Sequence, residues 1–336
     1  MKSLAGLLVI FILIIGLSAQ AGTLDEVKER DELICGTSGG KNGFSRSDGK
    51  GNWSGLDVDF CRAVAAAVLS DARKVKFVVL PEQELITALI SGNVDLLPGS
   101  SLLTQVRDTA LAVRFVGVSY YDGQGFMLSK KLAARSILEL EGAEVCVQRE
   151  TLMEQNLDMF FKRNKIPFES VPFNTLDQAI LGFTEGRCDA VTLEQSKLHD
   201  LRLNLGDQEG VRVLPGVISK LPLGPVVRRG DENWFSIIRW CLFALLQAEE
   251  YDISSGNFEV MKQNSNPHVR ILLGLDESTG TGMGLAQDWA LNIIKQVGNY
   301  SEIFERNLGQ GSELKIGRGI NGLWNQGGIH YAPPFH

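Results

Sequence analysis

A single arginine follows a strand-like segment and is a candidate for binding a carboxylate. Arg107 lies in the stretch SSLLTQVRD, residues 100–108, shortly after the apolar run NVDLLPG. A guanidinium binds a carboxylate through two parallel hydrogen bonds, which fixes both the position and the orientation of the bound group. Alternatively, Arg107 is a helix-surface cation paired with a nearby acid such as Asp108. Which role Arg107 has depends on the helices and strands around it.

The five cysteines suggest a second kind of chemistry, which is oxidation to disulfides. Cys35 and Cys61 lie on a strand and on the helix after it, and Cys146 and Cys188 lie on two later strand-like segments. In an oxidising compartment we expect the pairs Cys35–Cys61 and Cys146–Cys188, each within one half of the chain. The alternative is that none is oxidised. Cys241, on an apolar helix, is expected to be a buried thiol.

The first 21 residues have the pattern of a secretory signal peptide. Lys2 precedes about fifteen mostly apolar residues, and Ala19-Gln20-Ala21 is a small-x-small cleavage site. A retained membrane anchor is the alternative, but the run is short for a span. Cleavage would leave 315 residues and, because Lys2 is the only charged residue removed, change the net charge from −7 to −8. That length suggests two domains, and the acidic balance argues against a nucleic-acid partner.

The elements that must position these residues alternate between strand and helix. Patterning predicts strands at residues 32–38, 74–80 and 94–99, with helices at 57–71 and 82–93 between them. A second set repeats this order, with a strand-like segment at 125–131, strands at 143–148, 168–173 and 188–194, and helices at 151–164 and 175–186. Alternating strands and helices imply parallel sheets with right-handed crossovers. We therefore expect two similar α/β units with a cleft between them.

The last third of the chain lacks the alternation of strands and helices. Long helices are expected at residues 233–251 and 284–309, where Trp, Ile and Leu recur at helical spacing typical of core positions. Residues 311–336 are rich in Gly and Pro, so we expect a tail with little regular structure. The four histidines, His199, His268, His330 and His336, form no metal-ligand spacing, and neither a metal nor a cofactor is expected.

Four stretches together resemble one family. GNWSGLDVDFCRAVAAAV, YYDGQGFMLSKK, LPLGPVVRRGDENWF and the segment from Val297 to His336 are similar to the general, broad-specificity L-amino-acid substrate-binding proteins of bacterial ABC importers. The resemblance runs from about Val27 to Phe335. It implies an α/β type II periplasmic binding protein fold, in which two α/β lobes joined by two crossover strands close on an amino acid. Lobe 1 would comprise residues 22–126 and 226–310, and lobe 2 residues 127–225.

The resemblance also assigns roles to individual residues. It implies that Arg107 binds the ligand α-carboxylate and that Glu194, where the family more often has Asp, binds the α-ammonium. Ser100 and Thr151 would supply hydroxyl groups. Phe44 is a candidate wall for the ligand side chain, unless it belongs to the lobe core. Glu82 is a candidate side-chain contact, unless it is only a solvated acid at a helix start.

Several expected ligand contacts are altered in this chain. Leu102 replaces a hydroxyl-bearing residue, Leu103 replaces a tryptophan, and a TGTT-like turn has become RETL, residues 149–152. Glu150 stands where a glycine is usual and would place a negative charge near the carboxylate. Each lost hydroxyl removes about 0.5–1.5 kcal/mol of hydrogen bonding, or about 1.5–3 kcal/mol with a charged acceptor. A changed specificity is therefore expected, including ligands with an added cation.

Three functions follow as hypotheses. The first is a secreted, periplasmic, monomeric binding protein that delivers an amino-acid-like solute to an ABC permease without catalysis. The second is an enzyme similar to cyclohexadienyl dehydratases, with Glu150 or Glu82 as acid or base. The third is a degenerate binding protein that acts as a sensor or contacts a protein partner. Ligand-induced stabilisation distinguishes the first from the third, and product formation from arogenate or prephenate identifies the second.

Overall fold

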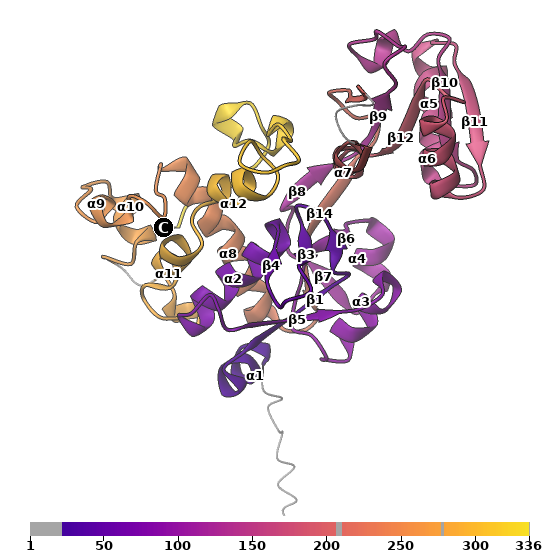
Figure 1. Cartoon of the computed structure of the whole chain (residues 1–336). Helices are drawn as coiled ribbons and strands as arrows, with labels where there is room; N and C mark the ends of the chain where they lie inside the picture. The colour runs from indigo at the N-terminus through magenta and orange to yellow at the C-terminus, as the bar shows by residue number, and fades with distance from the viewer. Residues whose placement is uncertain (1–21, 206–209, 277–278, 336) are drawn as a thin grey trace, which may run out of the picture.

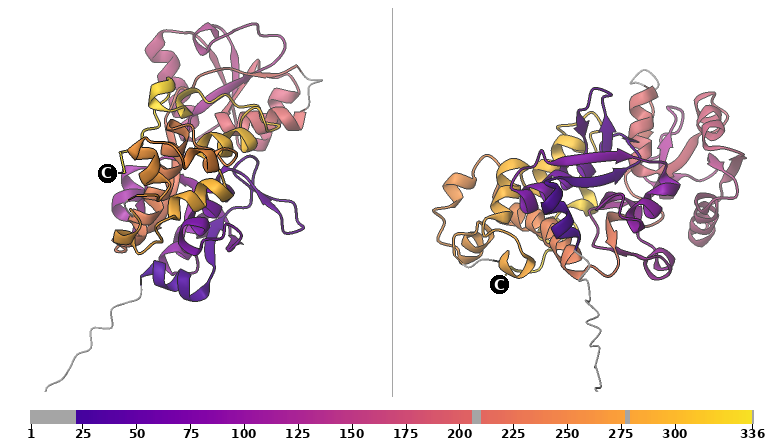
Figure 2. Two further views of the ribbon diagram at one scale, coloured as in Figure 1. Left: turned by 90° about the vertical axis from the view of Figure 1, so that its left-hand side faces the viewer. Right: turned by 90° about the horizontal axis from the view of Figure 1, so that it is seen from below.

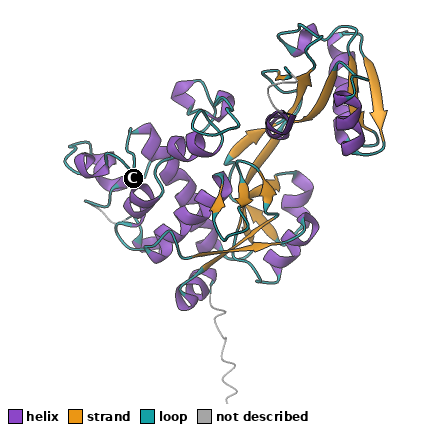
Figure 3. Cartoon of the chain, in the orientation of Figure 1, coloured by secondary structure: helices purple, strands orange, loops and turns teal. Residues whose placement is uncertain are grey.

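The computed structural model describes residues 22–205, 210–276 and 279–335, and these residues form two α/β lobes (Figure 1). Each lobe has a central sheet with helices packed on it (Figure 3). In the left-hand view of Figure 2, the N-terminal helix α1 (Thr23–Arg30, indigo) lies at the bottom of lobe 1, with lobe 2 at the top. The signal peptide predicted at residues 1–21 lies outside the described residues.

Lobe 1 contains the predicted parallel unit. β1 pairs in parallel with β5, and a parallel bridge from Cys35 to Leu96 places the β6 segment on the other side of β1. β14 then pairs antiparallel with β6, β7 and β8. The strands are β1 (Leu33–Thr37), β5 (Val75–Val79), β6 (Leu97–Leu102), β7 (Val113–Phe115), β8 (Tyr120–Asp122) and β14 (Leu221–Arg228), with the small sheet β2 (Gly40–Lys41), β3 (Ser45–Ser47) and β4 (Trp53–Ser54) beside them.

The lobe 1 helices bury apolar stripes against this sheet and against one another. α2 is Ala- and Val-rich because α11 packs closely along it, and Ala63, Val64 and Ala67 are all buried. The helices are α1 (Thr23–Arg30), α2 (Leu56–Leu69), α3 (Glu82–Ile90), α4 (Gln105–Ala110), α8 (Glu232–Glu250), α9 (Phe258–Met261), α10 (Pro267–Leu272), α11 (Trp289–Gln296) and α12 (Tyr300–Asn307), together with the 3-10 turn η3 (Thr281–Met283).

Lobe 2 has a five-stranded sheet in the order β11-β10-β12-β9-β13. β10 is parallel to both β11 and β12, as the sequence predicted, and β9 runs antiparallel to β12 and β13. The elements are β9 (Gln124–Leu128), η1 (Ile137–Glu139), β10 (Glu144–Gln148), α5 (Leu152–Asn164), β11 (Glu169–Phe173), α6 (Leu176–Thr184), β12 (Ala190–Glu194), α7 (Gln195–Leu205) and β13 (Arg212–Val213).

An aspartate plays the same part in each lobe. In lobe 1 the Asp95 carboxylate accepts a hydrogen bond from the Ile34 N–H at 2.8 Å. In lobe 2 the Asp189 carboxylate accepts one from the Glu144 N–H at 3.2 Å. The carboxylates therefore hold the start of β1 in lobe 1 and the start of β10 in lobe 2. This equivalence agrees with the repeated order of strands and helices that the sequence predicts for the two units.

Two chain crossings connect the lobes. The first runs from β8 to β9 through Gly123, and the second runs from β13 to β14 through residues 214–220. A Cβ atom on Gly123 would lie 2.6 Å from the Ser219 carbonyl oxygen and 2.7 Å from the Val217 Cβ. The two crossings therefore touch at a point where only glycine fits, and this contact forms the hinge region.

Both predicted disulfides are present. Cys35–Cys61 joins β1 to α2 with a Cα–Cα distance of 6.6 Å, and Cys146–Cys188 joins β10 to the start of the β12 segment at 5.7 Å. Each bond therefore lies within one lobe and leaves the hinge unconstrained. Cys241 is a buried free thiol, as predicted, and burial raises its pKa.

The predicted helix at residues 284–309 is wrong as a single element. α11 ends before Gly298, whose φ of 99° no helix continues, and α12 begins after Asn299. Asn299 and Glu302 form a reciprocal capping box at that start. Within residues 311–335 of the Gly- and Pro-rich tail, the regular structure is the short turns η4 (Gly319–Asn321) and η5 (Trp324–Gln326) and a bridge between Leu323 and His330. It is nevertheless fixed to lobe 1, because the Asn321 side chain bonds both backbone groups of Tyr121.

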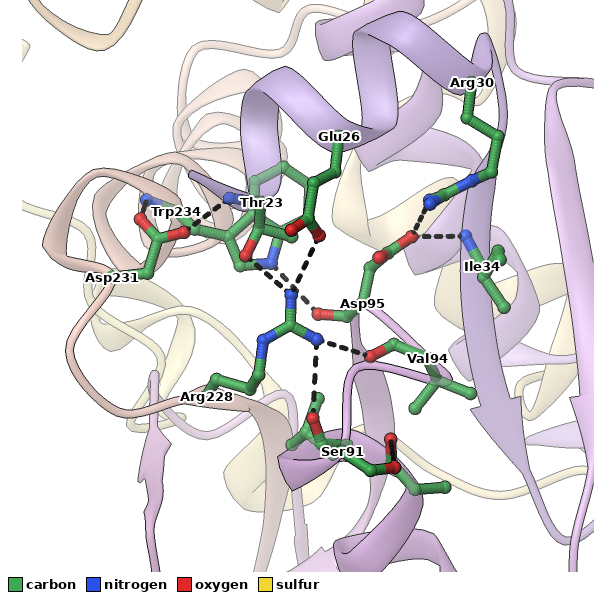
Figure 4. A network of polar contacts seen from close by, with 12 residues as sticks. Thr23, Glu26, Arg30, Ile34, Ser91, Val94, Asp95, Arg228, Asp231 and Trp234 are labelled. Carbon is green, nitrogen blue, oxygen red and sulfur yellow. Dashed lines mark hydrogen bonds and ion pairs between the residues drawn. The ribbon is translucent and has the colours of Figure 1, made fainter. Parts of the chain in front are cut away.

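A polar network fastens α1 to the rest of lobe 1 (Figure 4). The Arg228 guanidinium at the end of β14 donates to the Thr23 hydroxyl at 2.9 Å and to the Val94 carbonyl at 3.0 Å. The Asp231 carboxylate accepts from the N–H groups of Thr23 and Trp234. The first helix of the described chain is thereby held against elements more than 200 positions later in the sequence.

Candidate functional site

Arg107 lies where lobe 1 meets the space between the lobes. β6 ends at Leu102, and Thr104 caps α4 by accepting a hydrogen bond from the Arg107 N–H at 3.3 Å. The Arg107 side chain is exposed, and within residues 22–205, 210–276 and 279–335 it forms no ion pair, even with Asp108. The surface-pair alternative therefore has no contact to support it, and the guanidinium is free to bind a ligand.

Glu194 occupies the facing wall in lobe 2. It ends β12, opposite Gln124 in the β9 register, and its side chain is 19% exposed. Lys197, in the first turn of α7, forms an ion pair with the Glu194 carboxylate at 2.9 Å. A ligand ammonium group that binds Glu194 would compete with Lys197 for the carboxylate.

One cavity of about 440 Å³ brings three of the predicted residues together. Arg107, Glu82 and Glu194 all line it, the first two from lobe 1 and the third from lobe 2. Lys41, Lys197 and Asp200 complete its charged lining. We call this the front cavity. It holds cations and anions from both lobes, as a site for a zwitterion requires.

A second cavity of about 720 Å³ adjoins the front cavity and shares Glu194, Lys197 and Leu221 with it. Its lining includes uncharged polar side chains of lobe 2, among them Gln124, Gln148, Thr151 and Asn156. The two cavities together are far larger than one small amino acid needs, and their size suits ligands of drug-like dimensions.

Thr151 lines this second cavity, but its hydroxyl is already engaged. It donates to the Gln148 carbonyl at 2.7 Å and accepts from the Glu154 N–H at 3.3 Å, which caps α5. A hydroxyl oxygen has two acceptor lone pairs, so one remains for a ligand donor. The Thr151 hydroxyl therefore stabilises the local turn and can still accept one hydrogen bond from a ligand.

Glu150 and Phe44 are placed differently from the expectation. Glu150 is exposed and lines neither cavity, because its backbone has a φ of 60° and its N–H donates to the Glu154 carboxylate at 2.6 Å. Phe44 is 1% exposed in the lobe 1 core, with its ring edge-on to Tyr120 at 5.1 Å. The expected repulsion by Glu150 and the expected aromatic wall are therefore both absent from the described cavity lining. Ser100 lies on β6, but its side chain is outside the described part of the structure.

Sequence reasoning missed three polar residues of the cavities. Lys41 lies on the β2–β3 hairpin with its Nζ 4.0 Å above the Phe44 ring, and Lys197 is the partner of Glu194. Gln124 is buried and donates to the Thr192 hydroxyl at 3.0 Å and to the Met153 carbonyl at 2.9 Å. It thereby links β9, β12 and α5. The YYDGQG stretch contained this residue, but its spacing gave no sign of that role.

Two buried carboxyl groups lie close to Lys41. Burial raises the pKa of Asp57 to about 6, and the charge of Lys41 opposes that rise. Burial also raises the pKa of Asp122, against a 2.5 Å hydrogen bond from the Ser196 hydroxyl and the charge of Lys41. Since Ser196 belongs to α7 and Asp122 to β8, this bond crosses the hinge.

Comparison with known proteins identifies the family. Residues 33–259 match the model of the bacterial extracellular solute-binding proteins, family 3. The chain belongs to this family. It is 49% identical to the general L-amino acid-binding periplasmic protein AapJ of Rhizobium johnstonii, over 96% of each chain. It is 48% identical to the glutamate/glutamine/aspartate/asparagine-binding protein BztA of Rhodobacter capsulatus, over 95% of this chain and 94% of that one.

A solved structure agrees with the sequence relatives. An ABC transporter periplasmic binding protein from Brucella ovis, with glutathione bound, has 47% identity and a TM-score of 0.81, covering 94% of this chain and 100% of its own. The predicted type II periplasmic binding fold is thus confirmed, as is the resemblance to general amino-acid-binding proteins. The chain is a solute-binding component of an ABC importer, and its near relatives are periplasmic. Across the described ranges, helices of membrane-spanning length and apolarity are absent.

Proposed function

We propose that the front cavity binds the α-amino-acid end of a small solute, with Arg107 on its carboxylate and Glu194 on its ammonium group. The observation that carries this proposal is that the two residues, from different lobes, line one cavity and that Arg107 has no other ionic partner among the described residues. The two charges lie on opposite walls, so a zwitterion satisfies both only when it bridges the lobes.

The electrostatics favour this assignment over a neutral ligand. A hydrogen bond to a charged group contributes about 1.5–3 kcal/mol, and Arg107 can make two to one carboxylate. On the other wall the ligand ammonium exchanges with Lys197, whose ammonium group then moves to solvent. That exchange replaces one ion pair by another and changes the binding free energy little. The favourable binding free energy therefore comes chiefly from Arg107.

The rest of the ligand occupies the adjoining 720 Å³ cavity. Its uncharged polar lining, which includes Gln148 and Asn156, suits amide and hydroxyl groups better than a long apolar chain. The Brucella ovis protein holds glutathione and BztA is named for acidic amino acids and their amides, which supports this ligand class. We therefore include short peptides with a free amino-acid end among the solutes, beside single amino acids.

The remaining elements of the proposal concern the cellular setting. Cleavage after Ala21 yields a periplasmic mature chain, which acts as a monomer, binds no nucleic acid and delivers its solute to an ABC permease without catalysing a reaction. The periplasmic relatives and the two disulfides support an oxidising compartment outside the cytoplasm.

A ligand screen of the mature chain, residues 22–336, tests this function. Thermal shift with the common amino acids and glutathione identifies ligands, and calorimetry gives their dissociation constants. Arg107→Ala should raise the dissociation constant of each α-amino-acid ligand by about 30-fold or more, because losing a desolvated charge partner costs 2 kcal/mol or more. Arg163→Ala, an exposed arginine in the last turn of α5, is the matched control and should leave binding unchanged. An unchanged constant in Arg107→Ala would refute the clamp.

A further inference from the structure

The adjoining cavity, which is the space of about 720 Å³ beside the front cavity, has a charge balance of its own. Glu82 and Asp200 line the front cavity and do not line the adjoining one. Among the described residues, the charged lining of the adjoining cavity consists of Glu194, Lys197 and Lys220. One carboxylate and two ammonium groups therefore line this space, so its lining is positive before a ligand enters.

Binding of an amino-acid end leaves both lysines of this cavity without an ionic partner. In the proposed binding mode the ligand ammonium replaces Lys197 on the Glu194 carboxylate, and the ligand carboxylate lies at Arg107. Arg107 lines the front cavity and not the adjoining one. Like charges in a partly enclosed space repel one another, and a nearby anion lowers their energy. The adjoining cavity therefore favours a second, distal anionic group on the ligand.

Lys220 lies in the second crossing, where its neighbours in the chain are fixed to the first crossing. The Ile218 N–H donates to the Gln124 carbonyl at 2.8 Å, and the Ser219 hydroxyl accepts from the Gln124 N–H at 3.1 Å. On the other side, Leu221 begins β14 and pairs with β8. The Lys220 side chain is exposed, and across the described ranges it forms no ion pair. Its backbone is thus held at the hinge, and its ammonium group is available to a ligand.

The amino-acid end restricts how a longer solute can be built. The proposed binding mode takes the carboxylate and the ammonium group from one carbon atom. An α-linked peptide carries these groups at opposite ends, whereas a solute that is extended through its side chain keeps both on one carbon. Glu194, Lys197 and Leu221 line both cavities, so such a side chain can pass from the front cavity into the adjoining one. The flexible four-carbon stem of Lys220 lets its ammonium group adjust to side chains of different length.

We propose that the adjoining cavity selects solutes whose side chain ends in a carboxylate, and that Lys220 binds this distal carboxylate. The class comprises dicarboxylic amino acids and dipeptides that are linked through the side-chain carboxyl of their first residue. Lys197, once displaced from Glu194, adds a second positive charge at the wall of the same cavity. This inference rests on the proposed function, because it requires the amino-acid end to bind in the front cavity.

Two pairs of probes differ chiefly in the distal charge. L-Glutamate and L-glutamine are the short pair, and γ-L-glutamylglycine and its C-terminal amide are the long pair. Calorimetry on the mature chain at low salt should show, in at least one pair, an acid that binds about 5-fold more tightly than its amide, the upper range for a partly exposed ion pair. This ratio should fall as salt is added, because salt screens exposed charges. Equal binding of acid and amide in both pairs, or binding of neither acid, refutes the subsite.

Variants of Lys220 assign the preference to this residue. Lys220→Met removes the charge, keeps a flexible chain, and should weaken the acid about 5-fold while leaving its amide unchanged. Lys220→Arg keeps a cation and should retain the preference. Lys162→Met is the control, because Lys162 is an exposed lysine in the last turn of α5, roughly 15 Å along the helix from Leu152 at the cavity. A preference for the acid that persists in Lys220→Met refutes the role of Lys220.

Arg107→Ala distinguishes failure of this subsite from failure of the proposed function. Both members of each pair carry the same α-carboxylate, so Arg107→Ala should weaken acid and amide by the same factor, whereas Lys220→Met acts on the acid alone. If Arg107→Ala weakens both but the wild type binds acid and amide equally, the carboxylate clamp stands and the subsite is refuted. If Arg107→Ala changes neither, the proposed function fails, and the subsite fails with it.

Discussion

The buried carboxyl of Asp57 should make the protein lose stability as the pH rises from 4 to 7. Asp57 is 2% exposed at the start of α2, and its buried Oδ2 has no hydrogen-bond partner in the part of the chain that the structure describes. Its other oxygen lies against β6, since a Cβ atom on Gly99 would approach Oδ1 to 2.1 Å. Burial raises its pKa from 3.8 to about 6 even with Lys41 nearby.

The sign of this pH dependence follows from the number of protons that the folded and the unfolded chain bind. Between pH 3.8 and 6 the folded chain holds a proton on Asp57 that the unfolded chain has released, so the free energy of unfolding falls with pH. The stabilisation is complete below pH 3.8 and lost as the pH passes 6. Each pH unit in that interval costs 1.36 kcal/mol, and the whole interval costs about 3 kcal/mol.

Urea unfolding of the wild type and Asp57→Asn at pH 4 and pH 7.5 measures this effect. Asparagine does not titrate, so the variant should gain about 2.5 kcal/mol relative to wild type between the two pH values, because pH 4 lies just above the unfolded pKa of 3.8. Any change in the free energy of unfolding that Asp57→Asn causes equally at both pH values cancels in this comparison. Asp48→Asn is the control with the opposite sign, since the Asn52 side chain and backbone N–H groups lower the pKa of Asp48. A difference between Asp57→Asn and wild type that is the same at both pH values would refute the reasoning.

Two further predictions concern backbone geometry and capping. Glu150→Gly should raise the free energy of unfolding by up to about 1 kcal/mol in urea unfolding, because glycine tolerates the φ of 60° that Glu150 now adopts; a decrease would mean that the Glu150 side chain stabilises the turn. Asn299→Ala should lower the free energy of unfolding by about 1–3 kcal/mol, because the cap of α12 and the hydrogen bond to the Ile253 carbonyl are both lost. The exposed Asn164→Ala is its control, and an equal loss there would contradict the capping argument.

The sequence predicted the parts of the fold that local patterning controls. Alternating strands and helices gave the parallel units β1-β5 and β11-β10-β12, and the position of each cysteine pair within one half of the chain gave the disulfides. The break between α11 and α12 was missed because apolar residues keep helical spacing across it, at Ile293, Val297, Tyr300 and Phe304. A glycine followed by an N-capping Asn-x-x-Glu was the available signal.

The site residues were harder to place because side-chain direction depends on tertiary contacts. Phe44 follows the first strand, as a cavity wall would, but the β2–β3 hairpin turns it into the core beneath Lys41. Glu150 precedes the Thr151 cap, and the left-handed backbone there points it to solvent. Spacing along a chain does not distinguish the two sides of a loop. Glu150 was therefore assigned to the wrong surroundings, and for Phe44 the lobe-core alternative was the correct one.

The charges of the front cavity show why a changed ligand shell does not require an added cation on the ligand. Without Glu150, the charged lining consists of the Glu194–Lys197 ion pair together with Lys41, Arg107, Glu82 and Asp200, and the last of these is hydrogen-bonded to Asn42 across the lobes. Among the described residues, Lys41, Arg107 and Glu82 form no ion pair. In the binding mode proposed above, a zwitterion would use Arg107 and Glu194 and leave Lys41 on the lobe 1 wall. The charge of Lys41 also faces Asp57 and Asp122. A second anionic group on the ligand would therefore meet a cation whose charge the buried carboxyls already offset, so Lys41 favours such ligands only weakly.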